Sequence, residues 1–358
     1  MKIGIDISQI VYETGVSVYT KNLVKNLLII DKNNEYVLFG SSLRRSAYLK
    51  SFLTSLQGDA LKKLFPFPPV LLNLIWNKLH TLPIEKLIGK IDVFHSSDWT
   101  QPPTNALKVT TVHDLSPLKF PDETHPKIVN THKLRLEWVK KEVDRVIVPS
   151  KTTREDALEF GIPEKKIIVI PEAPDPIFKP SGQLEVQKLK RKYKIDGNYI
   201  LSIGANPRKN TKRIIDAFMK LKRSDLKLVI VGQPYFGEVT SSNVIFLGHA
   251  KVDDMPILYS GAEALVYPSL YEGFGLPILE SFACHTPVVT SKFGSMAEVA
   301  GGAAVLVDAY NVDSIAEGIT EAINKREILI NRGLTRIRDF SWEKTAKDTL
   351  EVYNEQFM

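Results

Sequence analysis

Two glutamates frame a short glycine-containing loop in this 358-residue chain: Glu272 precedes Gly273 and Gly275, and Glu280 follows Pro277. A proline fits the first turn of a helix, because its missing N–H has no acceptor there, and the glycines let backbone approach a ligand closely. The start of such a helix presents N–H groups and about half a positive charge, which favour a bound pyrophosphate. The sequence therefore predicts a phosphate-binding loop between two acids.

The two acids suit different parts of a nucleotide sugar. Glu272 is expected on the loop, where it can face a crevice. Glu280 is expected in the first turn of the helix, where a carboxylate is favoured and can accept hydrogen bonds from a diol such as ribose. Taken singly, Glu272 could be a solvated loop residue and Glu280 a helix-start charge. The glycine and proline spacing between them favours a nucleotide-sugar site.

Further candidate residues stand where predicted strands end or predicted helices begin. Arg208 and Lys209 precede the predicted helix Thr211–Leu221, and cations at a helix start are mildly unfavourable unless an anion lies nearby. They are therefore interpreted as partners of a diphosphate, with a solvated helix start as the alternative. His113 ends a predicted strand, and Asp114 could either orient its imidazole or cap the next turn.

Short β-branched runs alternate with helical patterns along the chain, which predicts an α/β fold with two parallel sheets. A proline cluster from Pro171 to Pro180 separates the two halves, because neither a helix nor a central strand tolerates such a run. We expect an N-terminal domain over residues 1–172 and a C-terminal domain over 173–340, with a helix at about 341–358 packing back on the first. Ser46–Lys90 is apolar, basic and interrupted by prolines, so it is either a helical insertion or a patch that touches lipid.

The composition, 44% apolar and 25% charged, predicts a globular chain with enough apolar residues for a sizeable core. A single cysteine, Cys284, excludes intramolecular disulfides and fits a reducing compartment. No secretory signal or membrane-spanning run is predicted, so we expect a soluble cytoplasmic protein, with peripheral contact at the inner face of the plasma membrane left open. Most of the net charge of +6 lies in the first 180 residues, which suggests an anionic ligand or membrane surface, or else ordinary solvated lysines. No dense basic stripe indicates nucleic-acid binding.

Glu272 and Glu280, separated by seven residues in EGFGLPILE, resemble the signature of the retaining glycosyltransferases of family 4. Other motifs of the C-terminal half share this similarity: Ile203-Gly204, Pro207-Arg-Lys-Asn210, Tyr259-Ser-Gly-Ala, Thr286-Pro-Val-Val, Ala297-Glu298-Val299 and Phe340-Ser-Trp342-Glu. The resemblance implies the GT-B architecture, in which two doubly wound Rossmann-like domains face each other across a cleft. It also implies an acceptor-binding N-terminal domain and a donor-binding C-terminal domain.

The resemblance further implies individual roles. Glu272 would contact the donor sugar, Glu280 would hold the ribose, and Lys209 would bind the pyrophosphate. Arg208 would replace an arginine that many members carry where this chain has Ala205. His113 would reach the donor sugar, and His95, at another predicted strand end, could line the acceptor side. The remaining donor-binding positions are Gly273, Phe274, Gly275, Leu276, Gly204, Asn206 and Gly15.

The chain departs from the family in the first strand–helix turn. Only Gly15 remains of the usual glycines there, Val18 replaces a frequent arginine, and His285 replaces a frequent glycine and is assigned no role. The single glycine also argues against a nucleotide-dependent oxidoreductase or epimerase, which should show G-x-G-x-x-G after its first strand. A non-catalytic sugar-nucleotide-binding relative is the other alternative, and it should lack Glu272, Lys209 or His113.

The resemblance implies a hexosyltransferase that retains anomeric configuration and needs no cofactor or metal. No Asp-x-Asp metal signature lies in a suitable loop, and Asp253-Asp254 is expected to cap a helix. The P-R-K-N loop and the Phe-Ser-Trp-Glu motif favour GDP-mannose as donor, with UDP-glucose or UDP-N-acetylglucosamine as the alternative. The acceptor would be a hydroxyl of a glycan or a lipid-linked molecule.

Overall fold

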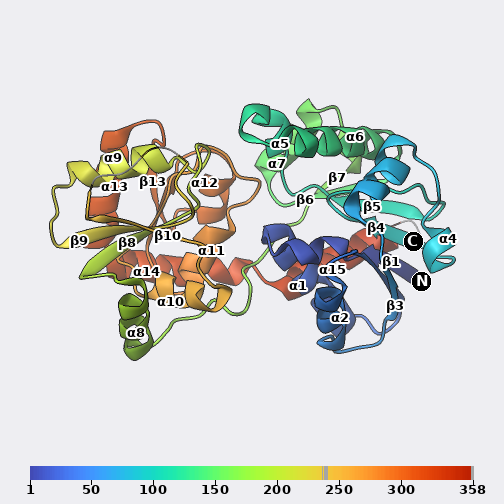
Figure 1. The fold of residues 1–358 in the computed structure, drawn as a ribbon, viewed down its shortest axis with the longest axis horizontal. Coiled ribbons are helices and arrows are strands. Elements are labelled where there is room, and N and C mark those ends of the chain that lie inside the picture. The colour runs from blue at the N-terminus through green and yellow to red at the C-terminus, as the bar shows by residue number, and fades with distance from the viewer. Residues whose placement is uncertain (236, 238–240, 356–358) are drawn as a thin grey trace. The chain divides into compact units, whose positions relative to one another are not determined.

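The computed structural model describes residues 1–235, 237 and 241–355, and it divides into two compact units (Figure 1). One unit comprises Met1–Ala173 with Ser341–Met358, and the other comprises Pro174–Phe340. Each contains one sheet of parallel strands with helices on both faces, which is the doubly wound arrangement that the alternating pattern predicts.

The sheet of the first unit has seven strands in the order β3-β2-β1-β4-β5-β6-β7. Strands β1, β4 and β5 are neighbours at its centre, so their carboxyl ends lie at the same edge. The strands are β1 Lys2–Asp6, β2 Glu35–Ser41, β3 Leu61–Phe65, β4 Val93–Ser96, β5 Leu107–Thr111, β6 Arg145–Val148 and β7 Ile167–Val169.

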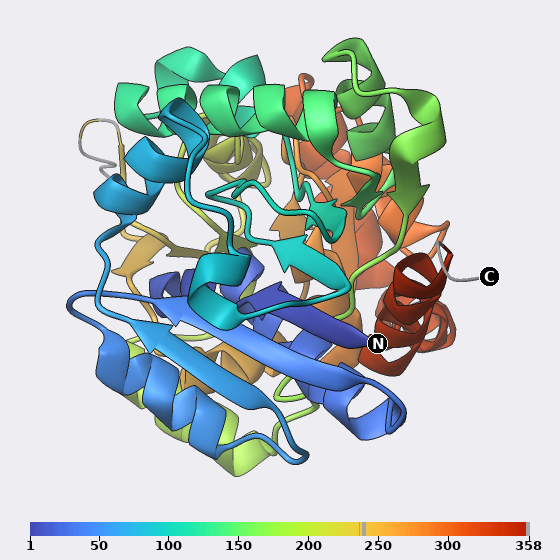
Figure 2. The same cartoon turned by 90° about the vertical axis from the view of Figure 1, so that its right-hand side faces the viewer.

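Helices cover both faces of this sheet, with α1, α2 and α15 on one side and α5, α6 and α7 on the other (Figure 1, Figure 2). The α-helices are α1 Gly15–Ile30, α2 Ser46–Thr54, α3 Pro69–Leu72, α4 Glu85–Ile88, α5 Ser116–Lys119, α6 Pro126–Glu142, α7 Lys151–Glu159 and α15 Trp342–Asn354. The shorter turns are η1 Ser8–Tyr12, η3 Pro121–Glu123 and η4 Glu164–Lys166, and η2 Asn73–Lys78 is a π-helix.

The segment Ser46–Lys90 is not purely helical, so that expectation is wrong in part. It contributes the edge strand β3 between α2 and α3. Lys62 and Lys63 lie at the exposed centre of this strand, and lysines of this kind protect a sheet edge from pairing with another chain. The alternating pattern of a half-buried strand is therefore absent from the sequence here.

The sheet of the second unit has six strands in the order β10-β9-β8-β11-β12-β13. They are β8 Asn198–Ile203, β9 Leu226–Val231, β10 Val244–Gly248, β11 Leu265–Tyr267, β12 Val288–Ser291 and β13 Val305–Val307. The helices are α8 Gln183–Tyr193, α9 Thr211–Lys220, α10 Met255–Ser260, α11 Leu276–Ala283, α12 Gly294–Ala300, α13 Val312–Asn324 and α14 Arg326–Arg336, with the turns η5 Val252–Asp254 and η6 Ile337–Asp339.

Successive residues of β8 belong to two different cores, one on each face of the second sheet. Leu201 packs in a core with Leu279 of α11, whereas its neighbour Ile200 packs in a core with Ile214 of α9. Since both faces are covered, the centre of the strand, Tyr199–Leu201, is a continuous apolar run instead of alternating. This explains why continuous apolar runs mark the strands of this unit.

Helix α15 packs against α1 in the first unit and is held by buried hydrogen bonds. The Tyr353 hydroxyl contacts Nδ1 of His95 at 2.6 Å, and the Thr345 hydroxyl donates to the carbonyl of Pro171 at 2.7 Å. His95 also contacts the Thr111 hydroxyl at 2.9 Å, and burial lowers its pKa to about 3. The expectation that His95 lines a ligand site is therefore wrong, because both ring nitrogens are paired within the protein, Nδ1 with α15 and Nε2 with β5.

Replacing Tyr353 with Phe removes the hydroxyl that contacts His95 and should lower the free energy of unfolding by about 1–2 kcal/mol, because a buried polar atom loses its partner. Urea unfolding and hydrogen exchange of the α15 amides measure the loss. Tyr310→Phe is the control, since Tyr310 is 61% exposed. Equal stability of the two variants would show that this contact does not hold the helix.

Candidate functional site

The loop between β11 and α11 has the geometry that its glycines and proline predict. Gly275 precedes the first helical residue and has φ of +114°, a conformation that side chains rarely adopt. Pro277 is the second residue of α11, where a backbone N–H would have no acceptor within the helix, so the missing N–H of proline costs no hydrogen bond. The loop can therefore turn sharply from the strand into the helix.

Glu272 forms a partly buried charge cluster with the two predicted cations. Its Oε1 accepts a hydrogen bond from Nζ of Lys209 at 2.6 Å, and its Oε2 lies 3.5 Å from Nη1 of Arg208. Burial would raise the pKa of Glu272, but the charges of Lys209 and Arg208 outweigh it and lower the pKa below the usual value. The carboxylate is thus ionised, and the two cations leave the cluster with one excess positive charge.

Gly204 and Asn206 support Lys209 from the loop after β8. A Cβ on Gly204, whose φ is +86°, would lie 2.8 Å from Cγ of Lys209. Only glycine therefore leaves room for the lysine side chain. The Asn206 carboxamide oxygen accepts a hydrogen bond from the Lys209 amide at 2.9 Å, so this side chain stabilises the turn. Both predicted positions contribute by placing the lysine.

Glu280 lies in the second turn of α11, not in the first as expected, because the helix begins at Leu276. It accepts a hydrogen bond from the Tyr259 hydroxyl at 2.6 Å. Burial, together with the charge of Asp175, raises the pKa of Glu280 to about 7. The charge of Lys209 acts in the opposite direction, so the lysine is coupled electrostatically to both acids of the motif.

Of the remaining loop positions, Phe274 directs its side chain into the core. Phe274 is 6% exposed, and its ring meets that of Phe340 edge-on at 5.9 Å. Gly273 and Gly275 are also buried, whereas Leu276 is partly exposed. Phe274 therefore has only its backbone to offer a ligand.

Three residues of this site were not given a role by the sequence. Ser269 and Tyr267 bond Glu272 and Lys209, respectively, and they lie where β11 ends, so their position was a usable indication. Tyr259 comes from α10, and no local pattern connects it with Glu280. Asp254, by contrast, makes no side-chain cap at α10 and instead bonds Lys192 and Tyr193, so its expected capping role is wrong.

The first unit places His113 just after β5, where Nδ1 contacts Oε1 of Glu172 at 2.7 Å. The ring also meets that of Tyr19 edge-on, with centroids 4.6 Å apart. Nε2 of His113 is buried and has no hydrogen-bond partner among the residues that the structure describes. Burial would lower the pKa of His113, but the bond and charge of Glu172 raise it overall.

Glu172 therefore orients the imidazole, while Asp114 caps the following turn by accepting hydrogen bonds from the amide and hydroxyl of Ser116. The sequence had left both roles open for Asp114. Glu172 lies between prolines of the linker segment, 59 residues from His113, and no sequence spacing indicated it. Gly15 is the exposed first residue of α1 and its φ is not positive, so its backbone is accessible without special geometry.

Two kinds of feature are absent from the described part of the chain. No group of three or more His, Cys, Asp or Glu side chains there could hold a metal ion. No helix within residues 1–235, 237 and 241–355 has the length and apolar character needed to cross a membrane.

Replacing Glu172 with Gln should lower the proton affinity of His113 by about 10- to 100-fold, because a charged acceptor becomes neutral. Titration of His113 by NMR measures the change. Since the folded pKa is raised, the pair stabilises the protein below about pH 6.5, and this contribution is lost as the pH rises through the folded pKa. Glu142→Gln, beside His80, is the control; an equal shift of His113 in both variants would refute the assignment.

The chain is similar to described glycosyltransferases along most of its length. Residues 14–176 match the family model described as "Glycosyltransferase Family 4", and residues 185–333 match "Glycosyl transferases group 1". The O-antigen chain mannosyltransferase B of Escherichia coli is 30% identical over 287 residues, which cover 73% of this chain and 74% of the relative.

Solved structures share the fold at lower identity. The sucrose-phosphate synthase of Thermosynechococcus elongatus has a TM-score of 0.72 and 17% identity, with 100% of this chain and 99% of that chain covered. Anabaena HepE, solved in complex with UDP and glucose, has a TM-score of 0.71 and 16% identity, with 98% and 99% covered. Two parallel-sheet Rossmann-like units, the matched family models and the mannosyltransferase relative agree: the chain belongs to the family 4 glycosyltransferases of the GT-B fold.

Proposed function

We propose that this glycosyltransferase moves a mannosyl group from GDP-mannose to a hydroxyl of a glycan or lipid-linked acceptor, with retention of the anomeric configuration. The observation that carries the proposal is the contact of Lys209 and Arg208 with the ionised Glu272 at the loop before α11. Mannose is favoured because the Escherichia coli relative is a mannosyltransferase. UDP-glucose or UDP-N-acetylglucosamine is the alternative donor, supported by the UDP and glucose bound to HepE.

The main chemical demand of this reaction is negative charge on the departing diphosphate. Lys209 and Arg208 supply two cations, and the N-terminus of α11 adds a partial positive charge and N–H groups. We infer that these groups stabilise the leaving group without a divalent metal or other cofactor. In this scheme the excess positive charge of the cluster is neutralised only when the diphosphate binds.

Glu272 has the second role in this scheme. Its ionised carboxylate can accept hydrogen bonds from the donor sugar and place it relative to Lys209, which bonds the same carboxylate. Front-face attack, in which the leaving phosphate helps to deprotonate the acceptor hydroxyl, then accounts for retention without a covalent intermediate. His113 in the first unit, positioned by Glu172 and with Nε2 unpaired among the described residues, would contact the donor sugar.

The two units have separate tasks in the proposal. Pro174–Phe340 would bind the donor through Glu280, Gly204 and the α11 loop, and the unit formed by Met1–Ala173 and Ser341–Met358 would bind the acceptor. We further propose peripheral contact of the acceptor-binding unit with a membrane surface, on the cytoplasmic side. Exposed Val70, Leu71 and Leu74 support this contact, because such side chains can enter a lipid interface.

Replacing Lys209 with Ala or Glu272 with Gln should lower turnover by about 100- to 1,000-fold, because each change removes a preorganised charged contact. The assay follows release of nucleoside diphosphate and transfer of labelled sugar in the presence of EDTA. Lys212→Ala, an exposed change on α9, is the control and should retain activity. Near-normal turnover of both site variants would refute the mechanism, and donor binding without any turnover by the natural chain would favour a non-catalytic relative.

Protonation of Glu280 should weaken nucleoside binding, because the ribose hydroxyls need an ionised acceptor. With a pKa of about 7 in the free chain, affinity should rise about tenfold between pH 6 and pH 8. Calorimetry with guanosine and uridine, which carry no titrating phosphate, measures this change and shows which base is preferred. We expect guanosine to bind more tightly.

Glu280→Gln should abolish the pH dependence of nucleoside binding. Glu185 lies at the exposed start of α8, so Glu185→Gln should preserve it. If nucleoside affinity rises with pH by the same factor in both variants, Glu280 does not bind the ribose. Tighter binding of uridine would select the UDP-sugar alternative.

A further inference from the structure

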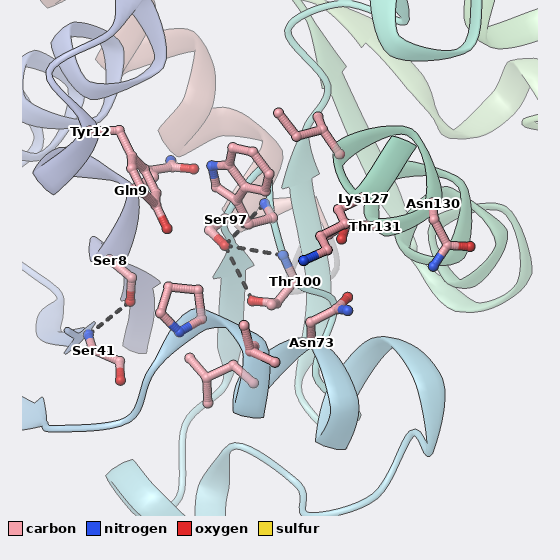
Figure 3. A pocket seen from close by; sticks show the side chains of 15 residues that line it. Ser8, Gln9, Tyr12, Ser41, Asn73, Ser97, Thr100, Lys127, Asn130 and Thr131 are labelled. Carbon is pink, nitrogen blue, oxygen red and sulfur yellow. Dashed lines mark hydrogen bonds between the residues drawn. The ribbon is translucent and has the colours of Figure 1, made fainter. Parts of the chain in front are cut away.

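A pocket of about 370 Å³ opens in the first unit, beyond the carboxyl ends of β1 and β4 (Figure 3). Its volume lies in the range of about 300–1,000 Å³ that is typical of small-molecule sites. Ser8, Gln9 and Tyr12 enter it from the turn after β1, and Ser97 and Trp99 enter it from the loop after β4. In a doubly wound sheet this edge is where ligands bind.

The walls of the pocket are largely apolar. Pro69, Val70 and Leu72 of α3 form one wall, and the rings of Trp99 and Tyr12 form another with their centroids 5.5 Å apart. Val70 is 79% exposed although it faces this pocket. An exposed apolar rim above an apolar wall indicates a ligand with a hydrocarbon or aromatic part.

Most polar groups in the deep part of the pocket already bond within the protein. The Ser8 hydroxyl accepts a hydrogen bond from the Ser41 amide at 2.9 Å, and the Ser41 hydroxyl donates to the carbonyl of Phe67. The Gln9 carboxamide bonds both the Thr20 hydroxyl and the amide of Asp98. These side chains offer a bound sugar few free donors or acceptors.

The Ser97 hydroxyl is used in the same way, since it accepts from the amides of Trp99 and Thr100 (Figure 3). The polar side chains of Ser8, Gln9, Ser41 and Ser97, which lie behind the apolar walls, therefore all have hydrogen-bond partners within the protein. The deep part of the pocket is therefore apolar in effect, although several polar residues line it.

Several unpaired polar groups lie on the side formed by α6. The side chains of Lys127, Asn130 and Thr131 have no hydrogen bond to any residue that the structure describes, and Lys127 points toward Thr100 (Figure 3). Among the described lining residues Lys127 is the only charged one. It lies in the first turn of α6, where a cation is unfavourable unless an anion is nearby.

We propose that this pocket binds an anionic amphiphile, with its hydrocarbon part between Val70, Trp99 and Tyr12 and its phosphate or carboxylate at Lys127. The assignment of this ligand to the acceptor rests on the proposed function. With the acceptor as its ligand, the pocket selects a molecule that carries an apolar group beside an anion and disfavours a free polysaccharide. The π-helix η2 begins at Asn73, and this residue lines the pocket. Such helices are frequent at functional sites.

Calorimetry with n-octyl phosphate, below its micelle concentration, tests the pocket on the full chain. It should bind at least about tenfold more tightly than inorganic phosphate or 1-octanol, because each probe lacks one half of the ligand. In a series from butyl to octyl phosphate, affinity should rise about fourfold per methylene and then level off when the pocket is full.

Val70→Asp should weaken octyl phosphate binding by at least about tenfold and Lys127→Glu by about fivefold. Leu184→Asp changes a residue of equal exposure in the other unit, and Lys133→Glu changes a lysine on α6 outside the pocket, so both controls should bind normally. Unchanged binding in both pocket variants would overturn the proposal. Displacement of octyl phosphate by phosphatidylglycerol vesicles would overturn the assignment of this amphiphile to the acceptor, because the site would then belong to a membrane lipid.

The affinity for GDP separates this inference from the proposed function. GDP should bind the pocket variants as it binds the natural chain, because Lys209, Arg208 and Glu280, which are proposed to hold the diphosphate and the ribose, belong to the other unit. GDP binding and turnover without octyl phosphate binding would refute only the pocket. Octyl phosphate binding without sugar transfer would refute only the proposed function.

Discussion

The contact between Lys209 and Glu272 is the interaction on which the second unit's site depends. A buried carboxylate without a cation costs several kcal/mol, so the loops after β8 and β11 must present both groups together. Gly204 leaves space for the lysine, and Asn206 holds the turn that carries it. Arg208 then adds the charge that a single pair would lack, which makes the cluster suited to a diphosphate.

In the first unit, an imidazole also depends on a partner of opposite charge. His113 is buried, and its bond to Glu172 keeps the ring oriented and its proton affinity high. Glu172 belongs to the proline-rich segment that leaves this unit, and the neighbouring Pro171 accepts a hydrogen bond from Thr345 of α15. The orientation of His113 and the attachment of the C-terminal helix therefore depend on the same short stretch of backbone.

The pocket near Trp99 shows why a count of polar residues is a poor guide to ligand chemistry. Serine and glutamine line it, yet their hydrogen bonds are satisfied by the turns after β1 and β4. What remains for a ligand is apolar surface and, on the side formed by α6, the polar side chains of Lys127, Asn130 and Thr131. This contrasts with the α11 loop, where charged groups dominate, and the contrast supports different ligand classes for the two units.

The sequence by itself determined the alternation of strands and helices and the loop before α11, because local spacing and strand ends encode them. It singled out Arg208 and Lys209 as cations for a diphosphate, but only the tertiary structure showed that both contact Glu272. The sequence missed β3, since an edge strand with two lysines lacks an alternating pattern, and it placed Glu280 one turn too early. Only the tertiary structure decided that Glu172 orients His113, that Tyr259 bonds Glu280 and that His95 anchors α15. Each of these contacts joins residues distant in the chain, so packing alone selects the partner and burial sets its charge.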